Sequence, residues 1–378
     1  MAATVPHAPY DEILRPLLAV AAEALPAGTT WFDAHTHIGH NDPDGYEADP
    51  EEILAALDHA GHQRAMLFPM HEPGGYREAN DWVIRTCQAS GGRLVALARV
   101  APSHEDAVAE AARALEAGAA GIKLHPRSDD FRLPHDAVSD VVRLVHERGG
   151  GPVLFHAGRG IPHLGEAVVE LCRAYPRARI ILAHAGISEL GWIEPAAAEL
   201  PNLFFDTAWW QVADLLALYA TVPPSQILYA SDLPYGSGLF HSWAMLRCAA
   251  AVGLAPAAQA AIAGASLERL LAGKEPFDLG PAPGTAALAP RDLGFERAVT
   301  YLGMAANFGY RGIDPTEPLS LARLALHRLD DHPVAAAVDA LVAVDLQRVV
   351  EAGGEPVGPI YGALAGQVLA GTPALSVS

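Results

Sequence analysis

Histidine and aspartate residues follow several apolar segments of this chain, at positions from which they could bind one metal ion together. His35 and His37 are two residues apart in a segment of strand character, so their side chains lie on the same face. His156, His184 and Asp232 each end another apolar run. Imidazole nitrogens combined with a carboxylate oxygen, without thiolate, suit Zn²⁺ or a similar divalent ion. Such an ion lowers the pKa of a bound water and produces a nucleophile near neutral pH.

Each of these histidines, taken alone, is more often an ordinary core or surface residue, and the chain has 17 histidines. A lone His-x-His pair is a weak motif. The set is more specific, because unpaired polar groups at the ends of separate buried strands would carry a large desolvation cost. A shared cation removes that cost, so we predict one divalent metal site, most readily for Zn²⁺.

Lys123 ends another apolar run and is one of only two lysines among 25 basic residues. An amine can lose its charge in a tight site and a guanidinium cannot, so we predict that Lys123 contacts substrate or an active-site carboxylate. The alternative is a structural ammonium paired with an acid. Arg159 follows the run that ends at His156 and could clamp a substrate carboxylate, or it is a solvated loop residue. His125 and Tyr235 are further substrate-binding candidates, because loops after strands determine substrate choice.

The elements that must position these residues alternate in character. Short apolar runs rich in β-branched residues are followed by segments with helical spacing, which indicates a parallel sheet covered on its faces. Eight such units predict a (β/α)₈ TIM barrel, in which functional groups gather at the C-terminal ends of the strands. A doubly wound open sheet is the alternative, but it usually has fewer strands and a glycine-rich first turn. The expected strands are 31–38, 64–69, 94–100, 121–125, 152–156, 180–184, 203–207 and 226–231.

The barrel is expected to occupy residues 31–272, preceded by a short helical N-terminal arm at 1–30. A linker rich in proline and glycine covers 273–290. Residues 291–378 form a helical C-terminal appendage, with helical spacing at 295–307, 319–329 and 334–350. The sequence assigns no role to this segment.

Composition excludes several classes of partner. The 378 residues carry a net charge of −19, which argues against binding nucleic acid or an anionic membrane surface. An apolar content of 51% excludes disorder as the dominant state. No secretory signal or membrane-spanning segment is expected. The three cysteines, Cys87, Cys172 and Cys248, lie far apart, so we predict reduced thiols and a cytoplasmic protein.

Five motifs together resemble the amidohydrolase-related branch of the amidohydrolase superfamily. They are His35-Thr-His37, Gly-Ile-Lys123-Leu-His125-Pro, Phe-His156-Ala-Gly, Leu-Ala-His184-Ala-Gly and Ala-Ser-Asp232-Leu-Pro. The segment beginning Gly264-Ala-Ser266 is similar to the closing helix motif of that branch, which usually has Asn in place of Ser266. The resemblance covers roughly residues 31–272.

The resemblance implies a metal-dependent hydrolase or a non-oxidative decarboxylase. It gives His35, His37, His156 and Asp232 as metal ligands and His184 as the general acid–base, although Asp232 could also take the proton from the attacking water. Some members of the superfamily bridge two metals with a carboxylated lysine. This branch usually keeps one metal, so we expect one ion and no carboxylated Lys123. The resemblance also suggests a homodimer.

Three functional hypotheses follow. The leading one is a hydrolase that acts on a C–N, C–O or lactone bond of a small molecule, which could be anionic. The second is a decarboxylase of an unsaturated or aromatic acid, in which Arg159 would hold the carboxylate. The third is a non-catalytic barrel that the metal stabilises and whose C-terminal segment binds a partner.

Overall fold

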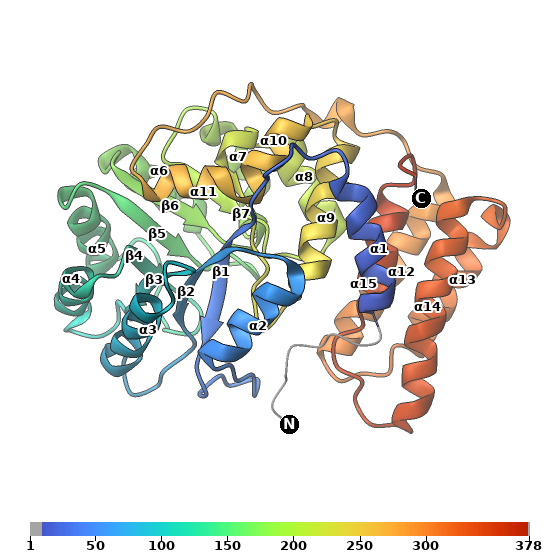
Figure 1. The fold of residues 1–378 in the computed structure, drawn as a ribbon, viewed down its shortest axis with the longest axis horizontal. Coiled ribbons are helices and arrows are strands. Elements are labelled where there is room, and N and C mark those ends of the chain that lie inside the picture. The colour runs from blue at the N-terminus through green and yellow to red at the C-terminus, as the bar shows by residue number, and fades with distance from the viewer. Residues whose placement is uncertain (1–9, 377–378) are drawn as a thin grey trace.

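The computed structural model describes residues 10–376 and contains eight parallel strands that pair in chain order (Figure 1). Backbone hydrogen bonds from Ala34 to Tyr229 and from His37 to Leu233 join the first strand to the residues around the eighth, so the sheet closes almost completely. The predicted TIM barrel is confirmed. Its strands are β1 (Phe32–Ile38), β2 (Arg64–Pro69), β3 (Leu94–Arg99), β4 (Gly121–Leu124), β5 (Gly151–Phe155), β6 (Ala178–Leu182), β7 (Leu203–Asp206) and β8 (Ile227–Leu228).

The strands are apolar almost throughout because both of their faces are buried. Met66, Leu154 and Ile181 belong to a cluster that fills the barrel, whereas residues of the opposite parity, such as Val153 and Ile180, pack toward the surrounding helices. This is the alternation expected for strands of a filled barrel.

A register irregularity in β1 directs the two histidines of that strand. Phe32 and Ala34 belong to the interior cluster, and the pairing with β2 then shifts between Asp33 and Thr36. The shift changes the parity of the strand, so His35 and His37 face the barrel interior beyond the apolar filling.

Amphipathic helices surround the strands, as α5 illustrates with its buried Val138, Val141, Val142 and Val145. The helix after β3 begins at Ala107, and the preceding Ser103 donates its Oγ hydrogen to the carbonyl of Asp129. The helices of the barrel are α2 (Pro50–Ala60), α3 (Arg77–Ala89), α4 (Ala107–Ala117), α5 (Asp136–Glu147), α6 (Leu164–Ala174), α7 (Leu190–Ala197), α8 (Val212–Thr221), α9 (Gly238–Ala251), α10 (Pro256–Ala260) and α11 (Ser266–Leu271).

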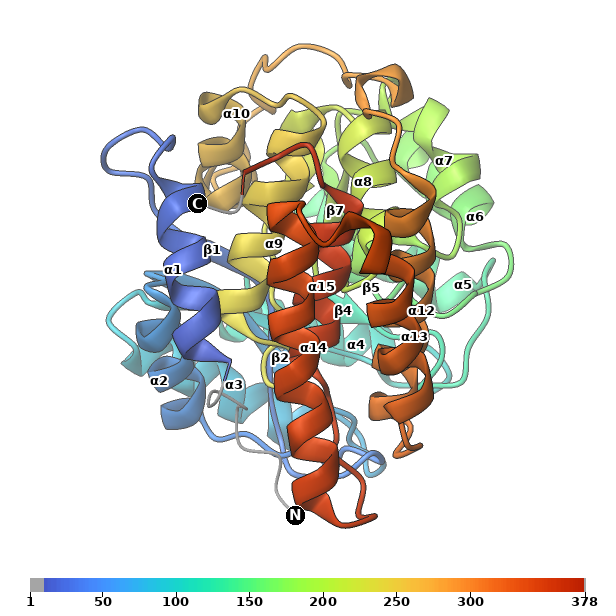
Figure 2. The ribbon, with the colours of Figure 1, turned by 90° about the vertical axis from the view of Figure 1, so that its right-hand side faces the viewer.

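The C-terminal segment forms a group of helices on one side of the barrel (Figure 2). Its α15 is buried along its whole length and packs against α8, α9, α12 and α14. This helix was not among the predicted ones, since a helix that is buried on every side shows no apolar period. The segment contains α12 (Leu293–Tyr310), α13 (Thr316–Leu326), α14 (Pro333–Ala352) and α15 (Tyr361–Gly371).

Polar contacts at several places tie this group to the rest of the chain. The hydroxyl of Tyr10, next to the N-terminal helix α1 (Asp11–Ala22), donates to Asp345 of α14 and accepts from Arg348. Arg247 of α9 is buried and donates to oxygen atoms of residues 372, 375 and 376. None of the helices within residues 10–376 has the length and apolar character needed to cross a bilayer.

Candidate metal centre

Three of the predicted ligand atoms converge at the C-terminal end of the barrel. His35 Nε2 lies 3.1 Å from His37 Nε2 and 3.3 Å from Asp232 Oδ1, and His37 Nε2 lies 3.2 Å from the same oxygen. The imidazoles are almost fully buried, while the Asp232 side chain is 21% exposed and faces the opening. Ligand atoms of His35, His184 and Asp232 also lie within 4.8 Å of one another, so His184 belongs to the same cluster.

Asp206, the last residue of β7, orients His35. Its Oδ2 lies 2.7 Å from Nδ1 of His35, and its Oδ1 accepts backbone hydrogen bonds from His184 and Ala208. The carboxylate therefore accepts a hydrogen bond from Nδ1–H of His35. This leaves the lone pair on Nε2, which faces Asp232. A second carboxylate behind a ligating histidine is a common feature of metal sites.

Hydrogen bonds also determine how His184 and His156 present their nitrogens. His184 Nδ1 lies 2.6 Å from the carbonyl oxygen of Ala208, which can only accept, so Nδ1 carries the proton. His184 Nε2 then accepts from His156 Nδ1 at 2.9 Å. His156 Nε2 consequently carries a lone pair, and it is buried with no protein partner. An orphaned acceptor of this kind fits a metal ligand.

The electrostatics of the cluster fit a cation as well. Burial lowers the pKa of His35, His37 and His156 well below the usual value, so these imidazoles are neutral donors. Burial raises the pKa of Asp232 well above its usual range, with Lys123 acting in the opposite direction. The neutral imidazoles can donate their lone pairs to a divalent ion. The same ion would stabilise the ionised form of Asp232, which is costly to bury alone.

Lys123 projects into the same space from β4. Its Nζ lies 3.4 Å from His35 Nε2 and 4.8 Å from the centre of the Phe68 ring. Burial lowers the pKa of Lys123 to about 7. Among the residues described, it forms no ion pair with a carboxylate within 4.0 Å. Within this distance the described residues show neither the structural ion pair that was the alternative nor the predicted contact with an active-site carboxylate, and the contact with substrate stays a prediction.

The structure brings the other substrate-binding candidates to the same end of the barrel in different environments. The ring of His125 stacks on His156 with a centroid separation of 3.9 Å. Tyr235 meets His37 edge to face at 5.2 Å and donates its hydroxyl to Asp42. Arg159 is exposed, and its charge acts on His184.

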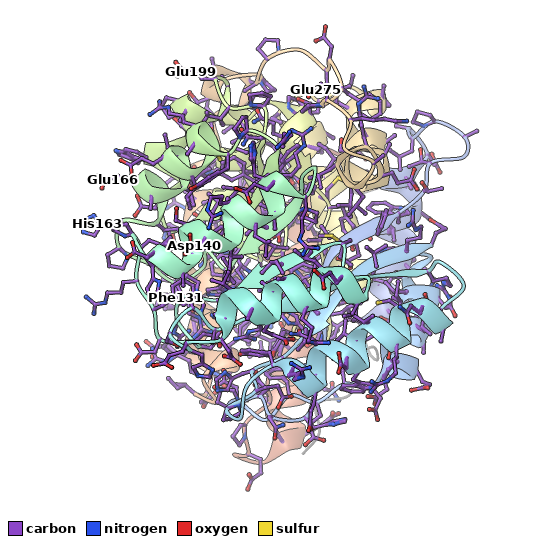
Figure 3. The ribbon with its side chains drawn as sticks, turned by 90° about the vertical axis from the view of Figure 1, so that its left-hand side faces the viewer. Phe131, Asp140, His163, Glu166, Glu199 and Glu275 are labelled. Atoms are coloured by element: carbon purple, nitrogen blue, oxygen red, sulfur yellow. The ribbon has the colours of Figure 1, made fainter. Side chains whose placement is uncertain are left out.

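The loop beyond Arg159 turns away from the site. His163 and Glu166 lie at the outer surface and pair with each other at 3.3 Å (Figure 3). A histidine close in sequence to the predicted ligands is thus a surface residue, as the ordinary interpretation of a single histidine expects.

Two buried features were missed by sequence reasoning. Asp206 carries the same signal as Asp232, a carboxylate at the end of an apolar strand, and this signal was available in Phe204-Phe205-Asp206. The second is the pair formed by Arg99 of β3 and Asp129, with nitrogen–oxygen distances of 2.9 and 3.1 Å. Asp129 lies in a loop 30 residues farther along the chain, so no local pattern indicated this pair.

Backbone conformation is unusual at three of the predicted site residues, since Arg159, with φ of 62°, shares a positive φ with His184 and Asp232. His184 has φ of 56° and Asp232 has φ of 60°, a region that residues other than glycine rarely adopt. Each such residue costs roughly 1 kcal/mol or more and is retained where surrounding contacts hold it. His184 lies two residues after the end of β6 and Asp232 four residues after the end of β8, and for His184 the hydrogen bond to Asp206 supplies such a contact.

Comparison with known families gives a clear result. Residues 32–272 match the family model described as amidohydrolase. The chain belongs to the amidohydrolase family. The expectation from the five motifs is thus confirmed, and the C-terminal helices lie outside the matched part. A search of curated proteins gave no match.

Solved structures with the same barrel are distant in sequence. An uncharacterised TIM-barrel protein from Bordetella bronchiseptica has 15% identity and a TM-score of 0.53, covering 65% of this chain and 99% of that protein. A 2,6-dihydroxybenzoate decarboxylase from Rhizobium has 16% identity and a TM-score of 0.50, covering 65% and 99%. A manganese-bound 5-carboxyvanillate decarboxylase mutant from Novosphingobium aromaticivorans has 15% identity and a TM-score of 0.50, covering 66% and 98%. These likenesses establish the TIM-barrel fold and no particular activity.

Proposed function

We propose that this amidohydrolase is a divalent-metal-dependent hydrolase that cleaves a C–N, C–O or lactone bond of a small molecule. The observation that carries the proposal is the convergence of His35 Nε2, His37 Nε2 and Asp232 Oδ1 within 3.1–3.3 Å of one another at the open end of the barrel. His156, with its orphaned Nε2, would complete the ligand set.

A bound divalent ion, for which we propose Zn²⁺, supplies Lewis acidity that activates water and polarises a carbonyl group. The protein contributes fixed orientation. Asp206 holds His35 in one tautomer, and the carbonyl of Ala208 does the same for His184. Neither imidazole needs to reorient during the reaction.

Proton transfer falls to Asp232 and His184. When water adds to the carbonyl carbon, one of its protons passes to Asp232 or His184. The proton then moves to the leaving nitrogen or oxygen as the bond to carbon breaks, so protons and charges balance. The exposed side of Asp232 is the side from which a substrate can approach.

A decarboxylase is the second candidate, and Arg159 is the observation in its favour. In the described part of the chain its guanidinium makes no hydrogen bond or ion pair, and its charge acts on His184, so it is free to hold a substrate carboxylate near the site. In this reaction the C–C bond breaks, CO₂ leaves, and the electron pair on carbon takes a proton from Asp232 or His184.

The compartment and the assembly remain part of the proposal. Cys87, Cys172 and Cys248 are free and buried, which suits a cytoplasmic enzyme with reduced thiols. A homodimer stays a prediction.

The proposal is tested by metal removal and readdition. The full-length protein is treated with a chelator and assayed with lactones, esters, N-acyl amides and aromatic acids, before and after addition of Zn²⁺ or Mn²⁺. We expect hydrolysis that is lost on chelation and restored by metal. Asp232→Asn should lower kcat by about 10³-fold or more, while Asp339→Asn, at a half-exposed position of α14 where the carboxylate pairs with Arg323, should not change it.

Three results would overturn the proposal. Hydrolytic activity that persists without metal would contradict it directly. Release of CO₂ without hydrolysis would favour the decarboxylase. Unfolding on metal removal, together with no turnover of any substrate class, would favour the non-catalytic barrel.

A further inference from the structure

The C-terminal helical segment reaches the open end of the barrel through Tyr310, the last residue of α12. The Tyr310 ring lies against Trp210, in the loop after β7, with centroids 5.7 Å apart and planes at 36°. Tyr310 lies outside the residues matched by the amidohydrolase model, which end at 272. A residue of the appended segment is therefore placed beside a loop of the catalytic face.

A series of aromatic rings connects this contact to the metal centre. Trp210 packs on Trp209 at 5.5 Å, and Trp209 lies 6.0 Å from the ring of His184. On the other side, Tyr46 packs on Tyr235 at 4.8 Å, and Tyr235 meets the ring of His37. We call the five residues Tyr46, Trp209, Trp210, Tyr235 and Tyr310 the aromatic collar.

Charged and titratable groups on the barrel side act on the hydroxyl of Tyr310. Burial raises the pKa of Tyr310, the charges of Tyr46 and Asp232 raise it further, and the charge of Arg159 lowers it. The charges of both Asp232 and Arg159 therefore act on the Tyr310 hydroxyl.

Only some polar groups of the aromatic collar form hydrogen bonds within the described part of the protein. Trp209 Nε1 donates to Asp214 and the Tyr235 hydroxyl donates to Asp42. The hydroxyls of Tyr46 and Tyr310 and Nε1 of Trp210, in contrast, form no hydrogen bond with any residue of 10–376. All three side chains are only partly buried, so these groups are available to a bound molecule.

The contact between the segment and the loop is built into the fold. Gln367 of α15 is buried, donates to Gln211 at 2.9 Å, and accepts from the backbone of Val212 at 3.3 Å. It also donates to the carbonyl of Val299 in α12. Gly303 of α12 permits this approach, because a Cβ atom there would lie 2.6 Å from Gln367 Nε2. One buried amide thus holds α12 and the loop of Trp210 together.

We propose that Tyr310 is a specificity-determining residue that contacts the substrate, and that the collar it completes selects a small anion with a flat, unsaturated body. The inference rests on the proposed function, because it takes the metal centre as the place where substrate reacts. Aromatic faces favour stacking with a flat molecule, and Arg159 complements its negative charge.

The test compares two acids of the same charge and carbon number. Benzoate is flat and cyclohexanecarboxylate is not. Their binding to the Zn²⁺-loaded full-length protein is measured by titration calorimetry. We expect benzoate to bind about fivefold more tightly. Tyr310→Leu should lose most of this preference, and Tyr310→Phe should keep it. Tyr301→Leu is the matched control, since residues 301 and 310 lie on opposite faces of α12.

Equal binding of the two acids by the wild-type protein, no binding of either, or an unchanged preference in Tyr310→Leu would overturn the inference. If Tyr310→Leu fails to fold, Trp210→Leu removes the ring on the barrel side and must lose the same preference. Because binding is measured at equilibrium, the result is separate from the proposed function. A benzoate preference that depends on Tyr310, combined with activity that survives chelation, would overturn only the hydrolase proposal.

Discussion

Oδ2 of Asp206 lies 2.7 Å from Nδ1 of His35, and both side chains are essentially inaccessible to solvent. This contact connects the last residue of β7 with the first histidine of the predicted metal site. It explains how an aspartate with no exposed surface can act on a site that opens to solvent at Asp232. The orientation of His35 depends on a carboxylate that no substrate reaches.

Asp206→Asn is expected to weaken metal binding because an amide can donate to His35 Nδ1 and reverse its tautomer. Loss of such a supporting partner typically costs roughly 10- to 100-fold in metal affinity or activity. Bound metal after dialysis against a buffered chelator is the measurement, with kcat as a second readout. Asp339→Asn serves as the exposed control. Unchanged metal affinity in Asp206→Asn would contradict this role of the carboxylate.

Substitutions of Lys123 should change the stability of the protein and its activity in different directions. Its side chain is buried without a carboxylate partner, so an ammonium there is costly. Lys123→Met is expected to unfold in urea within about 1 kcal/mol of wild type, or to be more stable, and to have lower kcat/KM. Lys123→Arg introduces a charge that cannot be lost and should destabilise the protein by about 3 kcal/mol. Equal stability of the two variants would contradict this account.

His62 gives a prediction for stability against pH. This residue lies beneath the barrel helices, away from the metal centre, with Nε2 2.8 Å from Ser242 Oγ. Burial lowers the pKa of His62 to about 3 in the folded protein. In the unfolded chain the imidazole becomes protonated near pH 6.5, whereas in the folded protein it stays neutral at that pH. Stability from His62 is therefore present above pH 6.5 and is lost as the pH falls toward 3.

His62→Gln should reduce the loss of unfolding free energy between pH 7 and pH 4.5 by about 2 kcal/mol. Chemical denaturation at several pH values measures this difference. His327→Gln, at an exposed position, should leave the pH profile unchanged. If the unfolding free energy of His62→Gln fell with pH as steeply as that of the wild-type protein, another group would be the cause of the acid sensitivity.

Arg247 is expected to anchor the end of the C-terminal segment. Its guanidinium donates to the Thr372 hydroxyl and to carbonyls of residues 372, 375 and 376, so Arg247→Met leaves several buried acceptors without partners. We expect a loss of about 2 kcal/mol in unfolding free energy and faster proteolysis at the C-terminal end. Arg297→Met, at an exposed position of α12, is the control. Equal protease resistance in both variants would argue against an anchoring role.

The barrel could be predicted because local physics determines it. Strands buried on both faces read as apolar runs, and their ends marked the positions of His35, His156, His184 and Asp232. The strands themselves are often shorter than predicted; the eighth covers Ile227–Leu228 instead of the predicted 226–231. The roles of these residues in catalysis remain predictions.

Features that depend on distant contacts could not be predicted. Trp210 and Tyr310 are 100 residues apart, and nothing in the spacing of either indicates that their rings meet. The helix α15 contains no charged residue and no polar face, so its sequence shows no helical period. Asp206 differs, since its strand-end position was visible and only its importance was missed.

The hydroxyl of Tyr10 meets Asp345 across 335 residues of chain, which has a consequence for biosynthesis. At about 5–20 residues per second, the ribosome adds Asp345 roughly 20 to 70 s after Tyr10. During that time the hydroxyl of Tyr10 has no Asp345 to contact, and Trp210 has no Tyr310 beside it. The barrel strands all emerge earlier, so the catalytic face acquires Tyr310, the last residue of the aromatic collar, only after all eight strands have been synthesised.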